Sequence, residues 1–251
     1  MENRIFSFTS PKAIKAEKYG YLNAIHYLAP HTLANVGNLC PHASPACSAA
    51  CLGWTSGQAS MVHNVTSRRV QGNSVRQSRI DKARRFMRDR ADYMRDVVRS
   101  LESAQRQAEK KRRKLCVRLN GSSDIAWEGV ACERYGIRYR NVFEAFGAVQ
   151  FVDYTKNQWR MIRALPANYH LTLSRSEINE AQCLETLARG QNVAVVFAAR
   201  HHGERPKHWN GFRVIDGDKH DLRHLDPQGV VVGLSPKGRA AKKDQSGFVV
   251  R

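Results

Sequence analysis

Three of the six cysteines, Cys40, Cys47 and Cys51, lie within one short stretch with the spacing C-x6-C-x3-C. Pro41 and Pro45 fix their own φ angles, so the first two cysteines are expected on an irregular loop that wraps around something compact. The small residues before Cys51 favour a helical turn whose backbone N–H groups would face the bound group. Three converging thiolates are ligands for a soft metal centre.

Two kinds of metal centre fit this spacing. Structural zinc is usually held by four ligands, often in C-x2-C pairs, and the second pair is missing here; His42 or His63 would have to supply the fourth ligand. An iron–sulfur cluster normally takes four cysteines, so three would leave one iron open. Three disulfides are the remaining use of six cysteines. With no signal peptide and no apolar run long enough for a membrane span, we expect a cytoplasmic, reduced protein instead.

The elements that would position this loop are read from the second half of the chain. Short apolar segments alternate there with helical patterns, which predicts an α/β fold with mostly parallel strands and right-handed crossovers. A further strand is expected within 21–28. We therefore predict a partial (β/α) barrel of about six to seven strands, the clearest of them at 115–119, 150–154, 169–173, 192–197, 212–215 and 229–234.

Polar residues follow the predicted strands where each one ends. In parallel α/β folds the carboxyl ends of the strands share one edge, and that edge carries the site. Carboxylates and cations there could position a polar cofactor or transfer protons, or could pair with one another to tie loops together. The candidate cofactor-binding residues are Asn120, Ser122, Asp124, Asp153, Lys156, Ser174, Arg175, Asp216 and Asp218. No residue is singled out as catalytic.

Basic charge is concentrated between the cysteine loop and the strands. The chain has a net charge of +19, and residues 68–118 hold 18 Lys and Arg against 6 Asp and Glu, a net of +12. Apolar residues at three- and four-residue steps predict one long helix from Val75 to about Lys111. Acidic residues could pair with part of this charge, but the run 110–114 has no acidic counterpart nearby. Segment 68–114 is therefore a candidate DNA- or RNA-binding surface, and no membrane contact is expected.

We find no linker or repeat, which predicts a single domain spanning 1–251. Its expected parts are an entry arm and first strand (1–34), the cysteine loop (35–66), the basic helix (67–114) and the β/α core (115–251).

The chain resembles two families. Over about residues 35–250 it is similar to the uncharacterised gene product 88 family of phages and mobile elements. The matching stretches are 38–41, 117–124, 153–156, 173–177 and 214–218, and Asp221, Arg223 and Asp226–Pro227 extend the last of them. This resemblance implies a phage or plasmid gene in a bacterial host, but no activity. More distantly, the early three-cysteine loop followed by β/α units resembles radical S-adenosylmethionine enzymes, whose usual spacing is C-x3-C-x2-C and whose open iron binds the cofactor. A Gly-Gly-Glu-Pro-like segment is missing.

These observations favour an iron–sulfur protein with a [4Fe-4S] cluster on Cys40, Cys47 and Cys51 in a radical-S-adenosylmethionine-like barrel. Such a protein could bind S-adenosylmethionine as an enzyme and act on or near nucleic acid. The alternative is a non-catalytic nucleic-acid-binding accessory protein with a structural or redox-sensing iron–sulfur or zinc centre.

Overall fold

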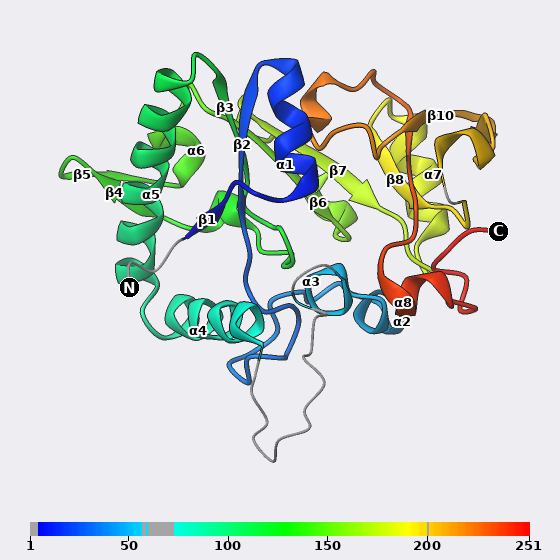
Figure 1. Cartoon of the computed structure of the whole chain (residues 1–251), viewed down its shortest axis with the longest axis horizontal. Helices are drawn as coiled ribbons and strands as arrows, with labels where there is room; N and C mark the ends of the chain where they lie inside the picture. Colours follow the sequence, from blue (N-terminus) through cyan, green and yellow to red (C-terminus); the bar gives the residue numbers. More distant parts are fainter. Residues whose placement is uncertain (1–4, 57–58, 60–72, 200) are drawn as a thin grey trace.

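The computed structural model describes residues 5–56, 59, 73–199 and 201–251, and an α/β architecture is formed around one large sheet (Figure 1). The sheet has nine strands in the order β1-β2-β3-β6-β7-β8-β11-β10-β9. The strands from β2 to β10 in this order are parallel, whereas β1 and β9 are antiparallel at the edges. Their bounds are β1 (Phe6–Ser7), β2 (Tyr21–His26), β3 (Lys114–Arg118), β6 (Gln150–Thr155), β7 (Tyr169–Ser174), β8 (Val193–Val196), β11 (Val231–Leu234), β10 (Phe212–Asp216) and β9 (His208–Trp209).

The predicted strands are confirmed, and they form one large, mostly parallel sheet. This sheet is not a closed barrel, and the predicted radical-S-adenosylmethionine-like partial barrel is not confirmed. Strand β11 lies between β8 and β10, so the last two parallel strands are not in chain order. The register confirms this exchange, since Val231 pairs with Val193 on one side and with Val214 on the other. Sequence patterns predict strands well, but the order of neighbours depends on long-range packing that no local pattern contains.

Both faces of the central strands are buried, as their continuous apolar runs require. On one face, Leu115 and Val117 of β3 join the main core with helix α5 (Arg90–Lys110). On the other, Cys116 packs with Val152 and Leu222 in a smaller cluster. Cys116 and Cys183 are completely buried and Cys132 is nearly so, and all three act as small apolar residues.

The predicted long basic helix is wrong in one respect, because the structure has two helices there, α4 (Ser74–Arg88) and α5 (Arg90–Lys110). The break is at Asp89, whose side chain accepts from the Asp92 amide and so begins α5. Arg85 of α4 pairs with Asp92 and Asp96 of α5 and joins the two helices across the break. The 3.6-residue period continues through the capping residue, and this explains why the pattern resembled a single helix.

Short helices complete the fold. The cysteine loop holds α2 (Pro45–Ala49) and α3 (Leu52–Thr55), which lie with α8 (Gly238–Lys242) along the lower edge of the view in Figure 1. No helix within the described ranges is both long and apolar enough to cross a membrane. The other α-helices and the small hairpin are α1 (Pro11–Ala16), α6 (Val142–Ala145), α7 (Glu180–Ala188), α8 (Gly238–Lys242), β4 (Cys132–Arg134) and β5 (Ile137–Tyr139).

The other helical turns that the structure describes are 3-10. They are η1 (Glu17–Tyr19), η3 (Trp127–Gly129), η4 (Gln158–Arg160), η5 (His202–Glu204) and η6 (Arg223–Leu225).

A cysteine-lined cavity as candidate functional site

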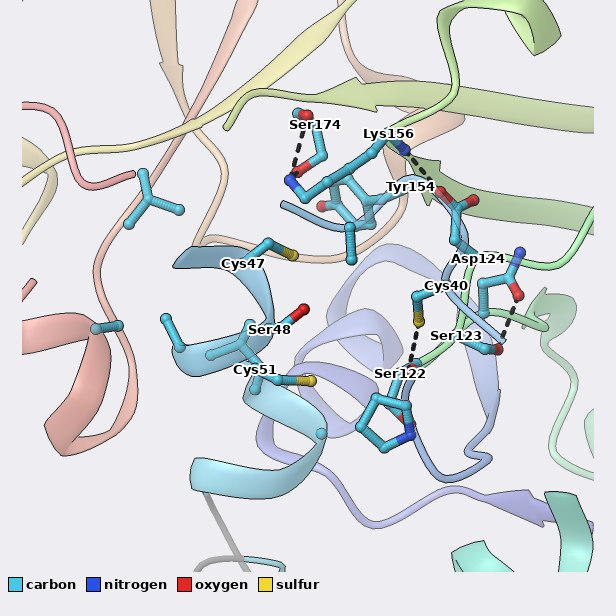
Figure 2. A pocket seen from close by; sticks show the side chains of 18 of the residues that line it. Cys40, Cys47, Ser48, Cys51, Ser122, Ser123, Asp124, Tyr154, Lys156 and Ser174 are labelled. Carbon is cyan, nitrogen blue, oxygen red and sulfur yellow. Dashed lines mark hydrogen bonds between the residues drawn. The ribbon is translucent and has the colours of Figure 1, made fainter. Parts of the chain in front are cut away.

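The three cysteines of the loop line one cavity of about 200 Å³. Figure 2 shows Cys47 and Cys51 pointing into it from α2 and from the residues after α2, while Cys40 projects from the opposite side. All three are free thiols, partly shielded from solvent. The three cysteines thus line one shared space.

Helix α2 positions the second cysteine. Ser44 precedes the helix, and its hydroxyl accepts from the Cys47 amide at 3.2 Å, while Pro45 occupies the first helical position. Glu177, from the segment after β7, accepts from the Ala46 amide at 3.1 Å and from the Ser44 hydroxyl at 2.7 Å. The loop is thus fastened to the carboxyl end of the sheet at the residue before Cys47.

Cys40 is held by backbone groups from two other segments. The His31 amide donates to its sulfur at 3.3 Å, and the Cys40 thiol lies 3.7 Å from the Ser122 carbonyl oxygen (Figure 2). The Asp124 amide donates to the Leu39 carbonyl at 2.8 Å. Because amide donors favour an anionic sulfur, the His31 contact suits a ligating thiolate.

Helix α4 anchors the part of the loop that follows Cys51. Arg79 donates to the Gly53 carbonyl, and Arg76 donates to the Trp54 carbonyl at 3.0 Å. Both guanidinium groups also lie over aromatic rings, Arg76 over Trp54 and Arg79 over Tyr27. Part of the basic segment is therefore used to hold the cysteine loop, a role that its sequence did not indicate.

Burial makes free thiolates unfavourable in this cavity. It raises the pKa of Cys40 to about 12 and that of Cys51 to about 11, and it also raises the pKa of Cys47. The ammonium of Lys156 opposes this shift at Cys47. A bound cationic centre would stabilise all three sulfurs as thiolates, as metal ligation does elsewhere.

The wall facing the cysteines is polar and comes from the ends of β6 and β7. The Lys156 ammonium donates to the Ser174 hydroxyl at 3.0 Å (Figure 2). It also donates to the Ser174 carbonyl at 3.3 Å and to the Arg175 carbonyl at 3.1 Å. Asp124 accepts from the Lys156 amide at 2.8 Å and pairs with the buried Arg160 at 3.1 Å. Of the predicted cofactor-binding residues, those that line this cavity are Asn120, Ser122, Asp124, Lys156 and Ser174.

Asn120 mainly shapes the turn after β3. Its side-chain oxygen accepts from the Ser123 hydroxyl, the Ile125 amide and the Trp127 indole. Its backbone N–H donates to the Asp153 carboxylate at 2.7 Å. The Ser122 hydroxyl donates to the Leu28 carbonyl at 2.6 Å. These hydrogen bonds fix the backbone that faces Cys40.

The remaining predicted residues lie outside the cavity lining. Asp153 is buried behind the turn, where it also accepts from the Tyr169 hydroxyl, and burial raises its pKa to about 7. Arg175 pairs with Glu180 and donates to the Gly247 carbonyl, which fixes the C-terminal segment. All four residues are thus bonded within the fold, Asp216 and Asp218 both through Arg205.

Asp216 and Asp218 form an ion-pair group with Arg205 in a separate hollow. Arg205 pairs with Asp216 at 3.0 Å and with Asp218, and it donates to the Ser235 hydroxyl at 2.6 Å. This group joins the ends of β10 and β11. The cavity also includes residues that the sequence did not single out, among them Arg118, Tyr154, Lys237 and Phe248. The signal for Tyr154 and Lys237 is their position at the ends of predicted strands, and Arg118 lies in the family-like stretch 117–124.

The sequence predicts a metal centre at these cysteines. Within the described part of the chain, no three His, Cys, Asp or Glu side chains are grouped so as to hold one metal ion. His42 is exposed, and His63 lies outside the described residues. A single zinc ion needs all of its ligands at bonding distance from one point. In a cluster, each thiolate binds a different iron, so the sulfurs need not converge on one point.

Fold and site together define an α/β protein with a mostly parallel sheet and a cysteine-lined cavity at its carboxyl edge. Within that class, the chain belongs to the gene product 88 family, whose model matches residues 4–251. No curated protein and no solved structure gives a significant match. The comparisons thus support the first family resemblance over nearly the whole chain and add nothing to the more distant one to radical S-adenosylmethionine enzymes.

Proposed function

We propose that this protein binds a [4Fe-4S] cluster through Cys40, Cys47 and Cys51. The observation that carries the proposal is that three free cysteines of one loop face a common, partly enclosed cavity. A bound cluster would supply one-electron chemistry, and its charge would offset the cost of burying three thiolates. Lys156, Ser174 and Asp124 line the same cavity and give it a polar wall.

Anaerobic purification followed by iron and sulfide analysis tests this proposal. We expect a brown protein with iron and acid-labile sulfide in equal amounts, and an electron paramagnetic resonance signal after reduction. A colourless protein that holds stoichiometric zinc, or no metal after reconstitution with iron and sulfide, would contradict it.

We further infer that the sheet is an open variant of the radical-S-adenosylmethionine barrel and that the non-cysteine side of the cavity takes S-adenosylmethionine. The support is the place of the three-cysteine loop at the carboxyl edge of seven parallel strands. The exchanged order of β10 and β11 departs from a regular barrel. Reduced protein incubated with S-adenosylmethionine should release methionine and 5′-deoxyadenosine. With an intact cluster and no such release, the protein is a non-catalytic cluster protein.

A second function, binding of DNA or RNA, is favoured by the exposed cations of α4, α5 and the turn after α5. Arg88, Arg106, Lys110, Arg112 and Arg113 are exposed, and none has a carboxylate within 4 Å among the described residues. By contrast, Arg85, Arg95 and Arg99 pair with Asp92 or Asp96. Four of these five cations lie at or just after the C-terminal end of α5, and Arg88 lies at the break between the two helices.

Salt dependence tests this second function. We expect affinity for a mixed-sequence oligonucleotide to fall steeply with salt, with a log–log slope of about 0.7 to 0.9 for each phosphate contacted. Replacing Arg112 and Arg113 together with Gln should reduce that slope by roughly 1.4 to 1.8. If the protein does not bind the oligonucleotide at low salt, this second function is wrong.

A further inference from the structure

The small hairpin β4–β5 has an unusual residue at its tip. Arg134 pairs with Ile137, so Tyr135 and Gly136 form a two-residue turn, with φ angles of 52° and 75°. Two successive positive φ angles define the turn type that best suits a two-residue hairpin, and Asn-Gly is its preferred sequence. Bulky residues such as tyrosine rarely adopt a positive φ.

A second hairpin in the same chain makes the comparison direct. In β9–β10, Trp209 pairs with Phe212, and the turn residues Asn210 and Gly211 have φ angles of 48° and 84°. The same backbone geometry is therefore made with the preferred residues at one hairpin and with tyrosine at the other. Turn formation alone does not account for Tyr135, and strained positions of this kind are often found at functional sites.

The tip presents apolar surface to solvent. Tyr135 is 77% exposed and Ile137 is 57% exposed, and Figure 1 shows the hairpin projecting from the molecule beside α5. The Arg134 guanidinium lies 4.8 Å from the centre of the Tyr135 ring and pairs with Glu102 of α5 at 3.2 Å. Arg134 thus places the exposed ring next to α5.

Basic side chains continue along α5 from the contact between Arg134 and Glu102. Arg106 and Lys110 follow Glu102 at steps of four residues, so they lie on the same helix face, about 6 and 12 Å further along the axis. Both are exposed, as is the neighbouring Glu109. On the hairpin side, Glu133 faces Arg138 and Glu144 pairs with Arg140. Segment 132–140 holds three Arg and one Glu, a net of +2.

We propose that the β4–β5 hairpin is a contact arm for single-stranded nucleic acid. In this arrangement the Tyr135 ring stacks on an unpaired base, and Arg106 and Lys110 contact the phosphates that follow. An exposed aromatic ring beside a track of cations is the combination that binds single strands without reading their sequence. The inference rests on the second proposed function and names the form of nucleic acid and the contact residues.

Substitution of the turn residue separates binding from folding. Tyr135→Asn converts the turn to the sequence used by β9–β10, so the variant should be at least as stable as the natural protein in thermal unfolding. Its affinity for a single-stranded oligonucleotide should fall about tenfold, the loss expected for one stacked base. Tyr135→Phe keeps the ring and should bind normally. The double variant Arg106→Gln/Lys110→Gln should lower the salt slope by about 1.4.

Binding to a duplex of the same length, measured by fluorescence anisotropy at the same salt concentration, completes the test. Because its bases are already stacked, the Tyr135→Asn variant should bind the duplex as tightly as the natural protein. Equal affinity of Tyr135→Asn and the natural protein for the single strand would overturn the inference while leaving nucleic-acid binding intact. If the natural protein binds no oligonucleotide at low salt, both the inference and the second proposed function are wrong.

Discussion

The guanidinium of Arg79 donates to the carbonyl oxygen of Gly53, two residues after the third cysteine, and lies 4.5 Å over the Tyr27 ring. One side chain of α4 therefore joins the cysteine loop to the segment that follows β2. Together with Arg76, this contact holds α3, which at four residues is too short to be stable on its own.

Replacing Arg79 with alanine should loosen the cysteine loop. Loss of a charge-assisted hydrogen bond and the ring contact should cost about 1 to 3 kcal/mol. Thermal unfolding should then shift downward by roughly 2–4 °C for each kcal/mol. Arg88→Ala, an exposed position on the same helix, is the control and should leave the unfolding temperature unchanged. Equal effects of the two substitutions would show that the Gly53 contact does not stabilise the loop.

Gly53 and Gly129 provide a test of close packing at the cavity. A Cβ atom on Gly53 would lie 2.2 Å from the Cβ of Ser122, whereas one on Gly129 would meet no atom within 4 Å. Gly53→Ala should therefore force the loop away from the turn after β3 and destabilise the protein by about 1 to 3 kcal/mol. Gly129→Ala should have little effect. Urea unfolding of both variants measures the difference.

Single cysteine variants should separate ligands from core residues. Cys40→Ser, Cys47→Ser and Cys51→Ser should each lose most of the iron and the visible absorption after reconstitution. Cys183→Ala, in a buried position on α7, should keep its iron although a small cavity lowers its stability. If all three loop variants retain their iron, the three cysteines are not its ligands.

Stability should fall on acidification because of His26. This buried ring lies 2.9 Å from the Leu119 carbonyl through Nδ1 and 2.6 Å from the Tyr93 hydroxyl through Nε2. The carbonyl can only accept, so Nδ1 carries the proton and Nε2 accepts from the tyrosine. Burial lowers the pKa of His26 to about 3, well below its value in an unfolded chain.

The direction of the change in stability with pH follows from proton binding. Between pH ~6.5 and the folded pKa, the unfolded chain binds a proton that folded His26 does not, so stability falls by about 1.4 kcal/mol per pH unit. Burial also lowers the pKa of His170 and His224 to about 4, which adds to the effect. Asp153, with its raised pKa, acts in the opposite direction between pH ~4 and 7. Urea midpoints from pH 7.5 to 5 should decrease, and a flat profile would contradict the assignment of a neutral His26.

Local patterns in the sequence determined the strands and the cysteine loop. Runs such as Val193–Val196 are apolar and mostly β-branched, and they form strands because such residues suit a sheet buried on both faces. The short spacing of Cys40, Cys47 and Cys51 places their sulfurs near one another in any compact loop. These features depend on neighbours in the chain and are therefore visible without the fold.

Only the tertiary structure decided which strand-end residues share the cavity. Lys156 and Ser174 line it, whereas Asp216 and Asp218 pair with Arg205, eleven and thirteen residues before them. The exchange of β10 and β11 and the capture of the loop by α4 are likewise long-range results. Such choices arise from packing and charge pairing between distant segments, and residue type at one position does not encode them.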